Sequence, residues 1–273
     1  MQRFESVRAL YRAQAAAAGG RWHALITHHG ATLLEDDADA VLHGYSVQKL
    51  AVAVAVLDAV DRGVFPLDHR VEVTADVILA GSGIYDLQTV WGDRVTVANV
   101  LAAMLLVSDN TAVRLCGSLV PALDINEILA AKGFTHTRVE PVGNPHRFFL
   151  GVTTPREIHD LLSRLVAGRL LKPGTTAFML GVLRALSGYH DGIRRVMSSA
   201  ERERVAAKYG ADWEDDFASR HEAGIMFDRA GRPALVFSLF ADRLGDVLNY
   251  GATHPAVQAH AVLGRALMDW TDR

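Results

Sequence analysis

The sequence predicts an α/β (α+β) fold with two lobes, in which an antiparallel sheet built from both chain ends lies beside an all-helical lobe. Strand-like segments near both ends, helical patterns through the middle and an apolar content of 50% in 273 residues lead to this prediction. A chain of this length can bury a sizeable core. We expect one domain over 1–273, with an α/β lobe at about 1–45 and 190–273 and a helical lobe at about 46–189.

Capping and stop signals define the elements of the first half. Gly19-Gly20 ends an opening helix that is rich in Ala, Arg and Gln. An Ala/Val/Leu-rich helix begins at Ser46 and stops at Gly63, and Thr96 is a good N-cap for the next helix. Residues 64–95 are expected to be irregular. In order, this half is predicted to contain a helix at 2–17, strands at 22–28 and 31–35, and helices at 46–61, 96–107 and 111–119.

The second half is divided by similar signals. Thr154-Pro155-Arg156-Glu157 combines a capping box with a proline at the first helical position, so a helix begins there and ends near Gly168. Gly231 supplies the turn between the last two of three strands. The remaining predicted elements are a helix at 175–186, strands at 204–209, 222–227 and 233–240, and a final helix at 255–270.

Charge and cysteine content exclude several functions. The net charge is −3 and the basic residues are dispersed, so we expect no nucleic-acid partner. The single cysteine, Cys116, cannot form an intrachain disulfide, and we predict neither a metal site nor a cofactor. The charged N-terminus is no signal peptide and the apolar run 50–57 is too short to span a bilayer. We therefore expect a cytoplasmic protein without membrane contact, or an extracytoplasmic one if the chain was trimmed.

Three short strings occur in one order along the chain. They are Ser46-Val47-Gln48-Lys49, Ser108-Asp109-Asn110 and Lys208-Tyr209-Gly210. They read as S-x-x-K, S-D-N and K-x-G, which is the motif set of serine β-lactamases and penicillin-binding proteins. Each string alone means little, but all three in this order, each in a plausible structural setting, indicate acyl-transfer chemistry.

The first string suggests a nucleophile and its base. Ser46 and Lys49 lie on one face at a helix start, where unpaired N–H groups and positive potential favour an alkoxide and disfavour a protonated lysine. If Lys49 is buried, its pKa falls below the ordinary value and the amine can act as a base. The alternative is that Ser46 only caps the helix and Lys49 is a surface lysine.

The other two strings have suitable chemistry for the same site. Ser108 can pass protons to a leaving group, Asn110 can hold a substrate amide, and Asp109 can fix the turn. Lys208 can stabilise a substrate carboxylate and bias Ser108, while Gly210 lets a ligand approach the strand edge. The alternatives are a helix break with a capping residue, and an ordinary edge lysine followed by a turn glycine.

With these motifs the chain resembles the class A β-lactamases and the related penicillin-binding serine hydrolases. The likeness continues through 66–68, 71–74, 96–97, 108–112 and 153–155, and covers about 20–270. The resemblance implies that Ser46 is the acylated nucleophile, Lys49 its base partner and Ser108 the proton shuttle. It also implies substrate contacts from Asn110, Lys208 and Gly210, and an oxyanion hole formed by the N–H groups of Ser46 and Ala211.

Two departures from the family concern the second step and the substrate. Glu140 and Asn144 map onto the pair that positions the hydrolytic water, although the loop 133–153 is short for the family; alternatively, Glu140 is a surface turn residue. Tyr209 stands where the family has a small hydroxyl residue that contacts the substrate carboxylate. Either the pocket is reshaped around Tyr209 or its ring packs elsewhere.

The sequence therefore predicts a serine hydrolase that forms an acyl-enzyme on Ser46 and acts on a small amide, ester or β-lactam. An intracellular esterase, amidase or peptidase of the same fold is one alternative. A penicillin-binding-like protein that acylates without hydrolysing is another. We expect a monomer or a weak homo-oligomer.

Overall fold

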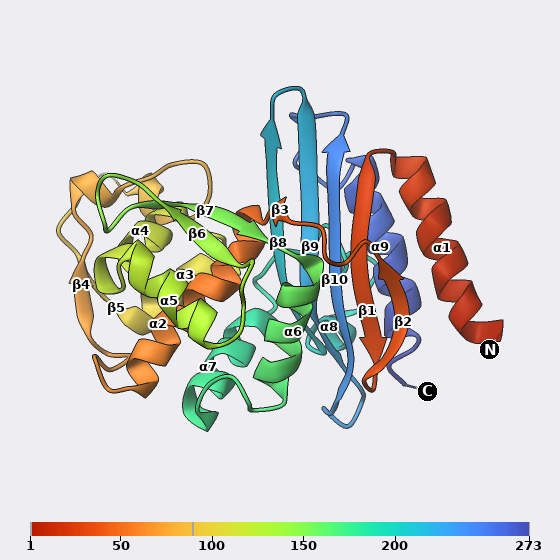
Figure 1. Cartoon of the computed structure of the whole chain (residues 1–273), viewed down its shortest axis with the longest axis horizontal. Coiled ribbons are helices and arrows are strands. Elements are labelled where there is room, and N and C mark those ends of the chain that lie inside the picture. Colours follow the sequence, from red (N-terminus) through yellow and green to blue (C-terminus); the bar gives the residue numbers. More distant parts are fainter. Residues whose placement is uncertain (1, 89, 273) are drawn as a thin grey trace.

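The computed structural model describes residues 2–88 and 90–272, and its central layer is a five-stranded antiparallel sheet (Figure 1). The strand order is β2-β1-β10-β9-β8, so strands from both chain ends meet in one sheet, as the sequence predicts. β8 is an edge strand and borders the helical part of the molecule. The strands are β1 (Arg21–His28), β2 (Ala31–Asp36), β8 (Val205–Glu214), β9 (Phe217–Phe227) and β10 (Pro233–Leu244).

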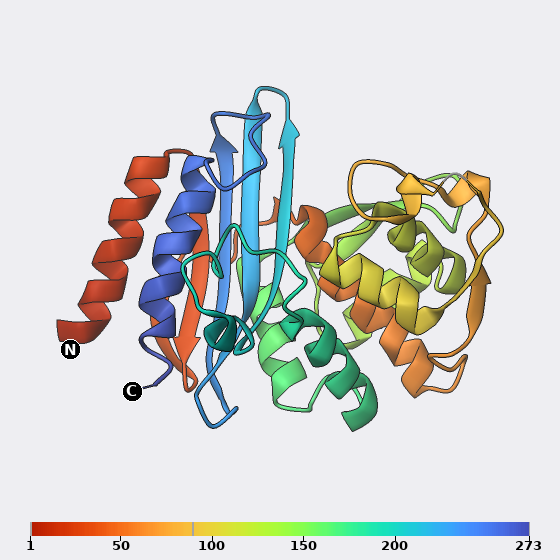
Figure 2. The same cartoon turned by 180° about the vertical axis from the view of Figure 1, so that it is seen from behind.

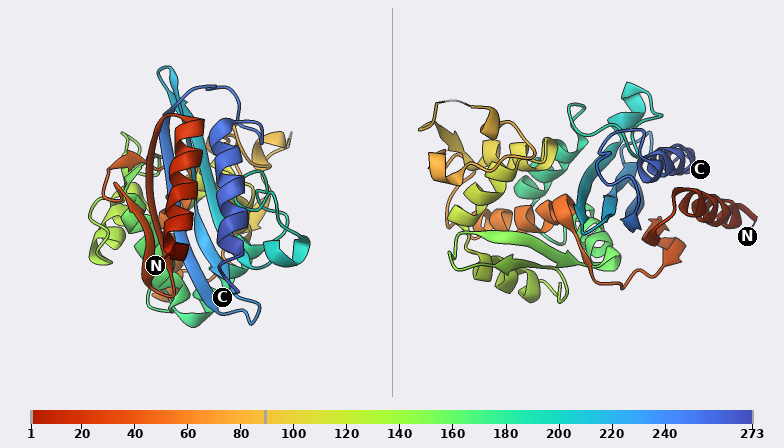
Figure 3. Two further views of the ribbon diagram at one scale, coloured as in Figure 1. Left: turned by 90° about the vertical axis from the view of Figure 1, so that its right-hand side faces the viewer. Right: turned by 90° about the horizontal axis from the view of Figure 1, so that it is seen from above.

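Two terminal helices cover one face of this sheet. α1 (Gln2–Ala18) and α9 (Pro255–Met268) lie side by side there, as seen from the side in Figure 3. A hydrophobic cluster that includes Trp22, Phe237 and Leu263 fills the space between these helices and the strands. Successive side chains along a strand point to opposite faces of the sheet, so one set of them enters this layer.

The centre of the helical part is α2 (Lys49–Asp61), in which every residue from Leu50 to Leu57 is 0% exposed. A helix that is apolar on all sides must be surrounded by other elements. Five helices contact it. They are α3 (Val97–Leu106), α4 (Asn110–Leu119), α5 (Ala122–Ala131), α6 (Pro155–Val166) and α7 (Pro173–Arg184). Figure 2 shows this helical part from behind. The buried centre of this part continues onto the sheet through residues of β8, β9 and β10.

The predicted helix caps are formed, with one difference. Thr96 accepts a hydrogen bond from Asn99 N at 3.2 Å, and Thr154 accepts one from Glu157 N at 3.0 Å. The Glu157 carboxylate does not close the predicted capping box, because it accepts N–H groups from residues 135–137 instead. This carboxylate therefore ties a preceding loop to the start of α6.

Several short elements lie where the sequence predicts loops. The segment 133–153, expected as a loop, contains β6 (Arg138–Pro141) and β7 (Phe148–Thr153), and β7 also pairs with β3 (Leu42–His43). α5 and the single turn α8 (Ser199–Arg202) are additional. The 64–95 region holds β4 (Arg70–Glu72), β5 (Arg94–Thr96) and the 3₁₀ turns η2 (Ala75–Val77) and η3 (Tyr85–Leu87). The elements of two to four residues leave no readable periodicity, whereas β7 with six residues and α5 with ten are long enough to read and were missed.

Within residues 2–88 and 90–272, no helix combines the length and the apolar character that crossing a membrane requires.

Candidate active site

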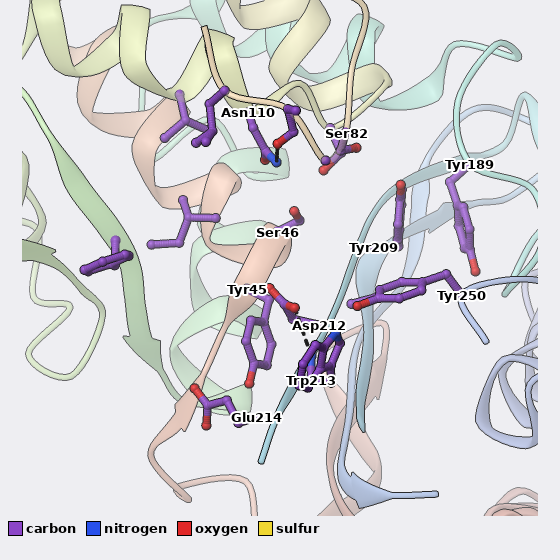
Figure 4. A pocket seen from close by; sticks show the side chains of 18 of the residues that line it. Tyr45, Ser46, Ser82, Asn110, Tyr189, Tyr209, Asp212, Trp213, Glu214 and Tyr250 are labelled. Atoms are coloured by element: carbon purple, nitrogen blue, oxygen red, sulfur yellow. Dashed lines mark hydrogen bonds between the residues drawn. The ribbon is translucent and has the colours of Figure 1, made fainter. Parts of the chain in front are cut away.

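A cavity of about 880 Å³ opens between the sheet edge and the helical part, and all three motifs meet there (Figure 4). Ser46 lies at its centre, Asn110 and Ser82 on one side, and Tyr209 on the β8 side. Its polar and aromatic lining residues are Tyr45, Ser46, Ser82, Ser108, Asn110, Phe148, Phe149, Tyr189, Asp191, Tyr209, Asp212, Trp213, Glu214 and Tyr250.

Ser46 is held in a 3₁₀ turn, η1 (Tyr45–Gln48), that leads directly into α2. The predicted helix start is therefore tighter than an α-helical turn. Tyr45 has a φ of 43°, a left-handed conformation that is uncommon for a bulky residue and that clusters at functional sites. Gln48 is buried and its Nε2 donates to the carbonyl groups of Leu150 at 3.1 Å and Val152 at 2.9 Å. This contact fixes the β6–β7 hairpin against the turn that carries Ser46.

Lys49 is fully buried and reaches the second motif. Its Nζ donates to Ser108 O at 2.5 Å, to Ser108 Oγ at 3.1 Å and to Asn110 Oδ1 at 2.8 Å. Burial lowers the pKa of Lys49 to about 7, against an opposing effect of the Asp109 carboxylate. Lys49 is therefore a buried lysine whose pKa is low enough for the neutral amine to act as a base near pH 7. A neutral amine has only two hydrogens, so deprotonation frees one of these three contacts.

Lys208 approaches the same hydroxyl from the sheet. It is buried on β8, and its Nζ donates to Ser108 Oγ at 3.0 Å and to Tyr209 O at 2.8 Å. Burial and the like charge of Lys49 lower the pKa of Lys208 well below its ordinary value. A hydroxyl has two lone pairs and one hydrogen, so the two lysines occupy both lone pairs of Ser108. The Ser108 hydrogen remains available to a third group.

The middle motif is held rigidly by Asp109. Its Oδ2 accepts the N–H groups of Ile84 at 2.7 Å and Tyr85 at 2.9 Å, and its Oδ1 caps α4 through Ala112 N at 2.8 Å. A Cβ on Gly83 would lie 2.2 Å from Asp109 Oδ2, so only glycine fits there. The predicted turn-fixing role and the capping alternative are thus both seen, because one carboxylate does both.

Comparison with known proteins identifies the family. The sequence matches the Beta-lactamase enzyme family over residues 4–271. The chain belongs to the beta-lactamase enzyme family. No curated protein matches the sequence.

Solved structures share the fold over almost the whole chain. A β-lactamase from Sphaerobacter thermophilus is 24% identical, with a TM-score of 0.80 over 98% of this chain and 97% of that one. A β-lactamase from Chitinophaga pinensis is 20% identical, with a TM-score of 0.82 over 97% and 98%. A protein described as PBP-A is 19% identical, with a TM-score of 0.77 over 96% and 94%. Family and fold together support a β-lactamase-like hydrolase.

In this β-lactamase family protein, Gly210 is packed directly against the turn that carries Ser46. A Cβ at Gly210 would lie 2.7 Å from Val47 N and 3.0 Å from Ser46 N. Real Cβ atoms do not approach backbone nitrogen so closely, so any side chain pushes β8 away from η1. Ala211, the next residue, lines the cavity. The glycine therefore sets the spacing between the two predicted oxyanion-hole donors.

We expect Gly210→Ala to lower kcat/KM by about 10- to 100-fold, somewhat less than the typical loss of a whole oxyanion-hole donor. The measurement is steady-state hydrolysis of any turned-over substrate, with melting temperature as a check on folding. Gly181→Ala is the matched control, because its Cβ meets nothing within 4 Å. Equal activity of the two variants would contradict this role.

Tyr209 forms part of the cavity wall in this β-lactamase family protein. Its ring lines the cavity and stacks on Tyr189 with centroids 3.9 Å apart and planes inclined by 20°. Its hydroxyl points toward the side of the cavity that carries Ser82 (Figure 4), and Lys208 Nζ lies 4.3 Å from its ring centroid. The ring therefore lies on the cavity wall and does not pack away from the cavity.

Glu140 and Asn144 lie apart from the other predicted residues. Glu140 is on β6, opposite Phe149 of β7, and does not line the cavity. Asn144 is in the hairpin turn and lines a separate cavity of about 440 Å³ near Asp76 and Arg147. The structure thus brings Ser46, Ser108, Asn110, Tyr209 and Ala211 together around one cavity, with Lys49, Lys208 and Gly210 directly behind them. The water-positioning role of the other two residues stays a prediction.

Sequence reasoning missed most of the cavity's aromatic wall. Tyr45, Tyr189, Trp213 and Tyr250 line the cavity but belong to no motif. Trp213 lies on the part of β8 beyond the predicted strand end, and Tyr189 lies in an irregular segment. Only Tyr45, beside the S-x-x-K string, has a local signal.

Proposed function

We propose that this protein is a serine hydrolase that forms an acyl-enzyme on Ser46 and hydrolyses a β-lactam or a related amide. The observation that carries the proposal is the Ser108 hydroxyl bridged by Lys49 and Lys208 at a cavity lined by Ser46. Burying two amines beside one hydroxyl costs desolvation free energy, and a site with only a structural role does not need this arrangement. Such a site can move protons next to a nucleophile.

The acylation step follows from these contacts. Neutral Lys49 exchanges one of its present contacts for Ser46 Oγ and takes its proton, while the oxygen attacks the substrate carbonyl. The N–H groups of Ser46 and Ala211 stabilise the resulting oxyanion. Ser108 then donates its hydrogen to the departing nitrogen, the C–N bond breaks, and the proton is replaced through the lysines. Water later attacks the ester carbonyl and releases Ser46.

The acylation rate should depend on pH through Lys49. The pKa of this lysine is lowered to about 7 by burial, and only the neutral amine can accept the Ser46 proton. Acylation is therefore expected to be slow below pH 6, to rise through about pH 7 and to reach a plateau above pH 8. Single-turnover acylation rates from pH 5.5 to 9 test this. A rate that is flat or falls across this range would argue against a neutral Lys49 base.

Intact-mass spectrometry with benzylpenicillin tests the proposal and separates its alternatives. A transient adduct on Ser46 supports hydrolysis of the amide. A permanent adduct supports a penicillin-binding-like protein that does not complete the second step. An aryl-ester adduct on Ser46 without a penicillin adduct supports an esterase or amidase of the same fold. An adduct on another residue refutes the proposed nucleophile.

If Glu140 positions the hydrolytic water despite its place on β6, Glu140→Ala should slow deacylation by about 10²-fold and leave acylation unchanged. General-base assistance to water matters only in the second step. The two rates are read from a pre-steady-state time course with a turned-over substrate. Glu203→Ala, which removes an exposed carboxylate elsewhere, is the control. If both rates stay the same in the Glu140 variant, this residue has no part in the reaction.

A further inference from the structure

The charged residues that line the active-site cavity all carry the same sign. Asp191, Asp212 and Glu214 are lining residues, whereas no lysine, arginine or histidine lines it in the described parts of the chain. The two lysines behind the cavity do not offset this charge fully, because burial lowers the pKa of both Lys49 and Lys208. The space a substrate enters is therefore electrostatically negative.

The guanidinium of Arg220 lies behind this wall, and it is already occupied. Arg220 is only 2% exposed, and its nitrogens donate to backbone carbonyl groups, including Asp212 O at 3.0 Å and Asn249 O at 2.7 Å. The Tyr250 ring covers it, with the guanidinium carbon 4.5 Å from the ring centroid. Arg220 therefore supports the wall from behind and is not offered to a substrate carboxylate.

The part of the wall beside the acidic residues is aromatic. Figure 4 shows Tyr45, Trp213 and Tyr250 grouped with Asp212 and Glu214 on one side of Ser46. Trp213 is 46% exposed and Tyr250 is 45% exposed, so both retain surface for a ligand. Aromatic faces attract cations within about 6 Å of the ring centroid. Carboxylates and aromatic faces together form the surroundings that an ammonium group prefers.

The carboxylates of Asp212 and Glu214 are exposed and still have free hydrogen-bond acceptor positions. Asp212 Oδ1 accepts Trp213 N at 2.9 Å, and Glu214 lies 3.7 Å from His43 Nδ1. A carboxylate has about four acceptor positions, so these contacts leave room for a ligand. Figure 4 shows Glu214 beside the hydroxyl end of Tyr45, so the charged and aromatic groups adjoin.

We propose that this cavity takes a cationic substrate: an ester or amide whose ammonium group lies against Tyr45, Trp213 and Tyr250, beside Asp212 and Glu214, while its carbonyl faces Ser46. The proposal rests on the proposed function, because it concerns the substrate of the same site. Tyr209 is consistent with it, because its ring, stacked on Tyr189, occupies the β8 side of the cavity.

Three aryl esters of equal acyl length test the substrate preference. Their acyl chains end in a trimethylammonium, a tert-butyl or a carboxylate group, which are cationic, neutral and anionic. We expect kcat/KM for the trimethylammonium ester to exceed that for its tert-butyl isostere by about tenfold or more, with the carboxylate ester slowest. The double variant Asp212→Asn, Glu214→Gln should lose most of this preference. Asp124→Asn, an exposed change on α5, should keep it.

Binding provides an independent readout if no ester is turned over. Calorimetric titration of the wild-type protein should show that phenyltrimethylammonium binds, that the double variant weakens it, and that benzoate binds less tightly. A faster carboxylate ester, tighter benzoate binding, or an unchanged preference in the double variant would overturn the proposal. Adducts that form without Ser46 would instead refute the proposed function and leave the binding result to stand alone.

Discussion

Replacing Ser46 by alanine is expected to abolish covalent labelling and to lower kcat by about 10⁴-fold or more, as removal of a nucleophile does in other serine hydrolases. The reason is geometric as well as chemical. Ser46 lies in the 3₁₀ turn that Tyr45 enters with positive φ, at the centre of the cavity and beside the edge of β8. Alanine fits this turn without strain, so the fold should be unchanged. Intact-mass spectrometry and burst kinetics with an aryl ester provide the measurements.

The control for this experiment comes from the same cavity. Ser82 also lines it, and its hydroxyl donates to Val107 O at 3.2 Å. Ser82→Ala should keep the adduct, because the two amines reach Ser108 rather than Ser82. If the Ser46 variant is still labelled and the Ser82 variant is not, then Ser82 is the nucleophile and the proposed mechanism is wrong.

The fold was predictable from the sequence because its decisive signals are local. Thr96 and Thr154 cap α3 and α6 with their own side chains, and the apolar run from Leu50 to Leu57 can only belong to a buried helix. All five sheet strands were predicted along the chain, but their order within the sheet was not. The predicted β8 and β9 are also too short at their hairpin, where exposed residues such as Trp213 and Phe217 continue the ladder. The division of the chain into two lobes stays a prediction.

Only the site residues that belong to one of the sequence motifs were predictable. Residues 108 and 208 are 100 positions apart, yet S-D-N and K-x-G suggested the pairing that the Ser108–Lys208 hydrogen bond forms. No local sequence signal predicts that Gln48 ties the hairpin to the Ser46 turn or that Tyr189 stacks on Tyr209. Their positions are set by tertiary packing. Glu140 was expected in a loop, but it lies on β6 of this hairpin.

Lys49→Met is expected to slow acylation by about 10³-fold, near the middle of the range for removing a positioned general base. Methionine has a similar length and suits a buried position, so the change removes the amine without opening a large cavity. Ser108 and Asn110 each lose a donor, but Ser108 Oγ still accepts from Lys208, and Asn110 keeps its N–H bond to Ser82 O and its Nδ2 bond to Ala80 O. We expect the adduct still to form on Ser46, only slowly. Stopped-flow acylation rates and melting temperature provide the measurements.

Lys49→Arg separates a proton-accepting lysine from a merely positive one. A guanidinium keeps the charge but does not lose its proton at any accessible pH, so it cannot take the Ser46 hydrogen. If Lys49 acts as a base, the arginine variant should be as slow as the methionine variant and should lose the pH dependence near 7. If arginine instead restores rapid acylation, the role of residue 49 is electrostatic and the proton from Ser46 leaves by another path. Lys132→Met, which removes a partly buried lysine paired with Asp58 in the helical part, controls for the loss of a positive charge alone.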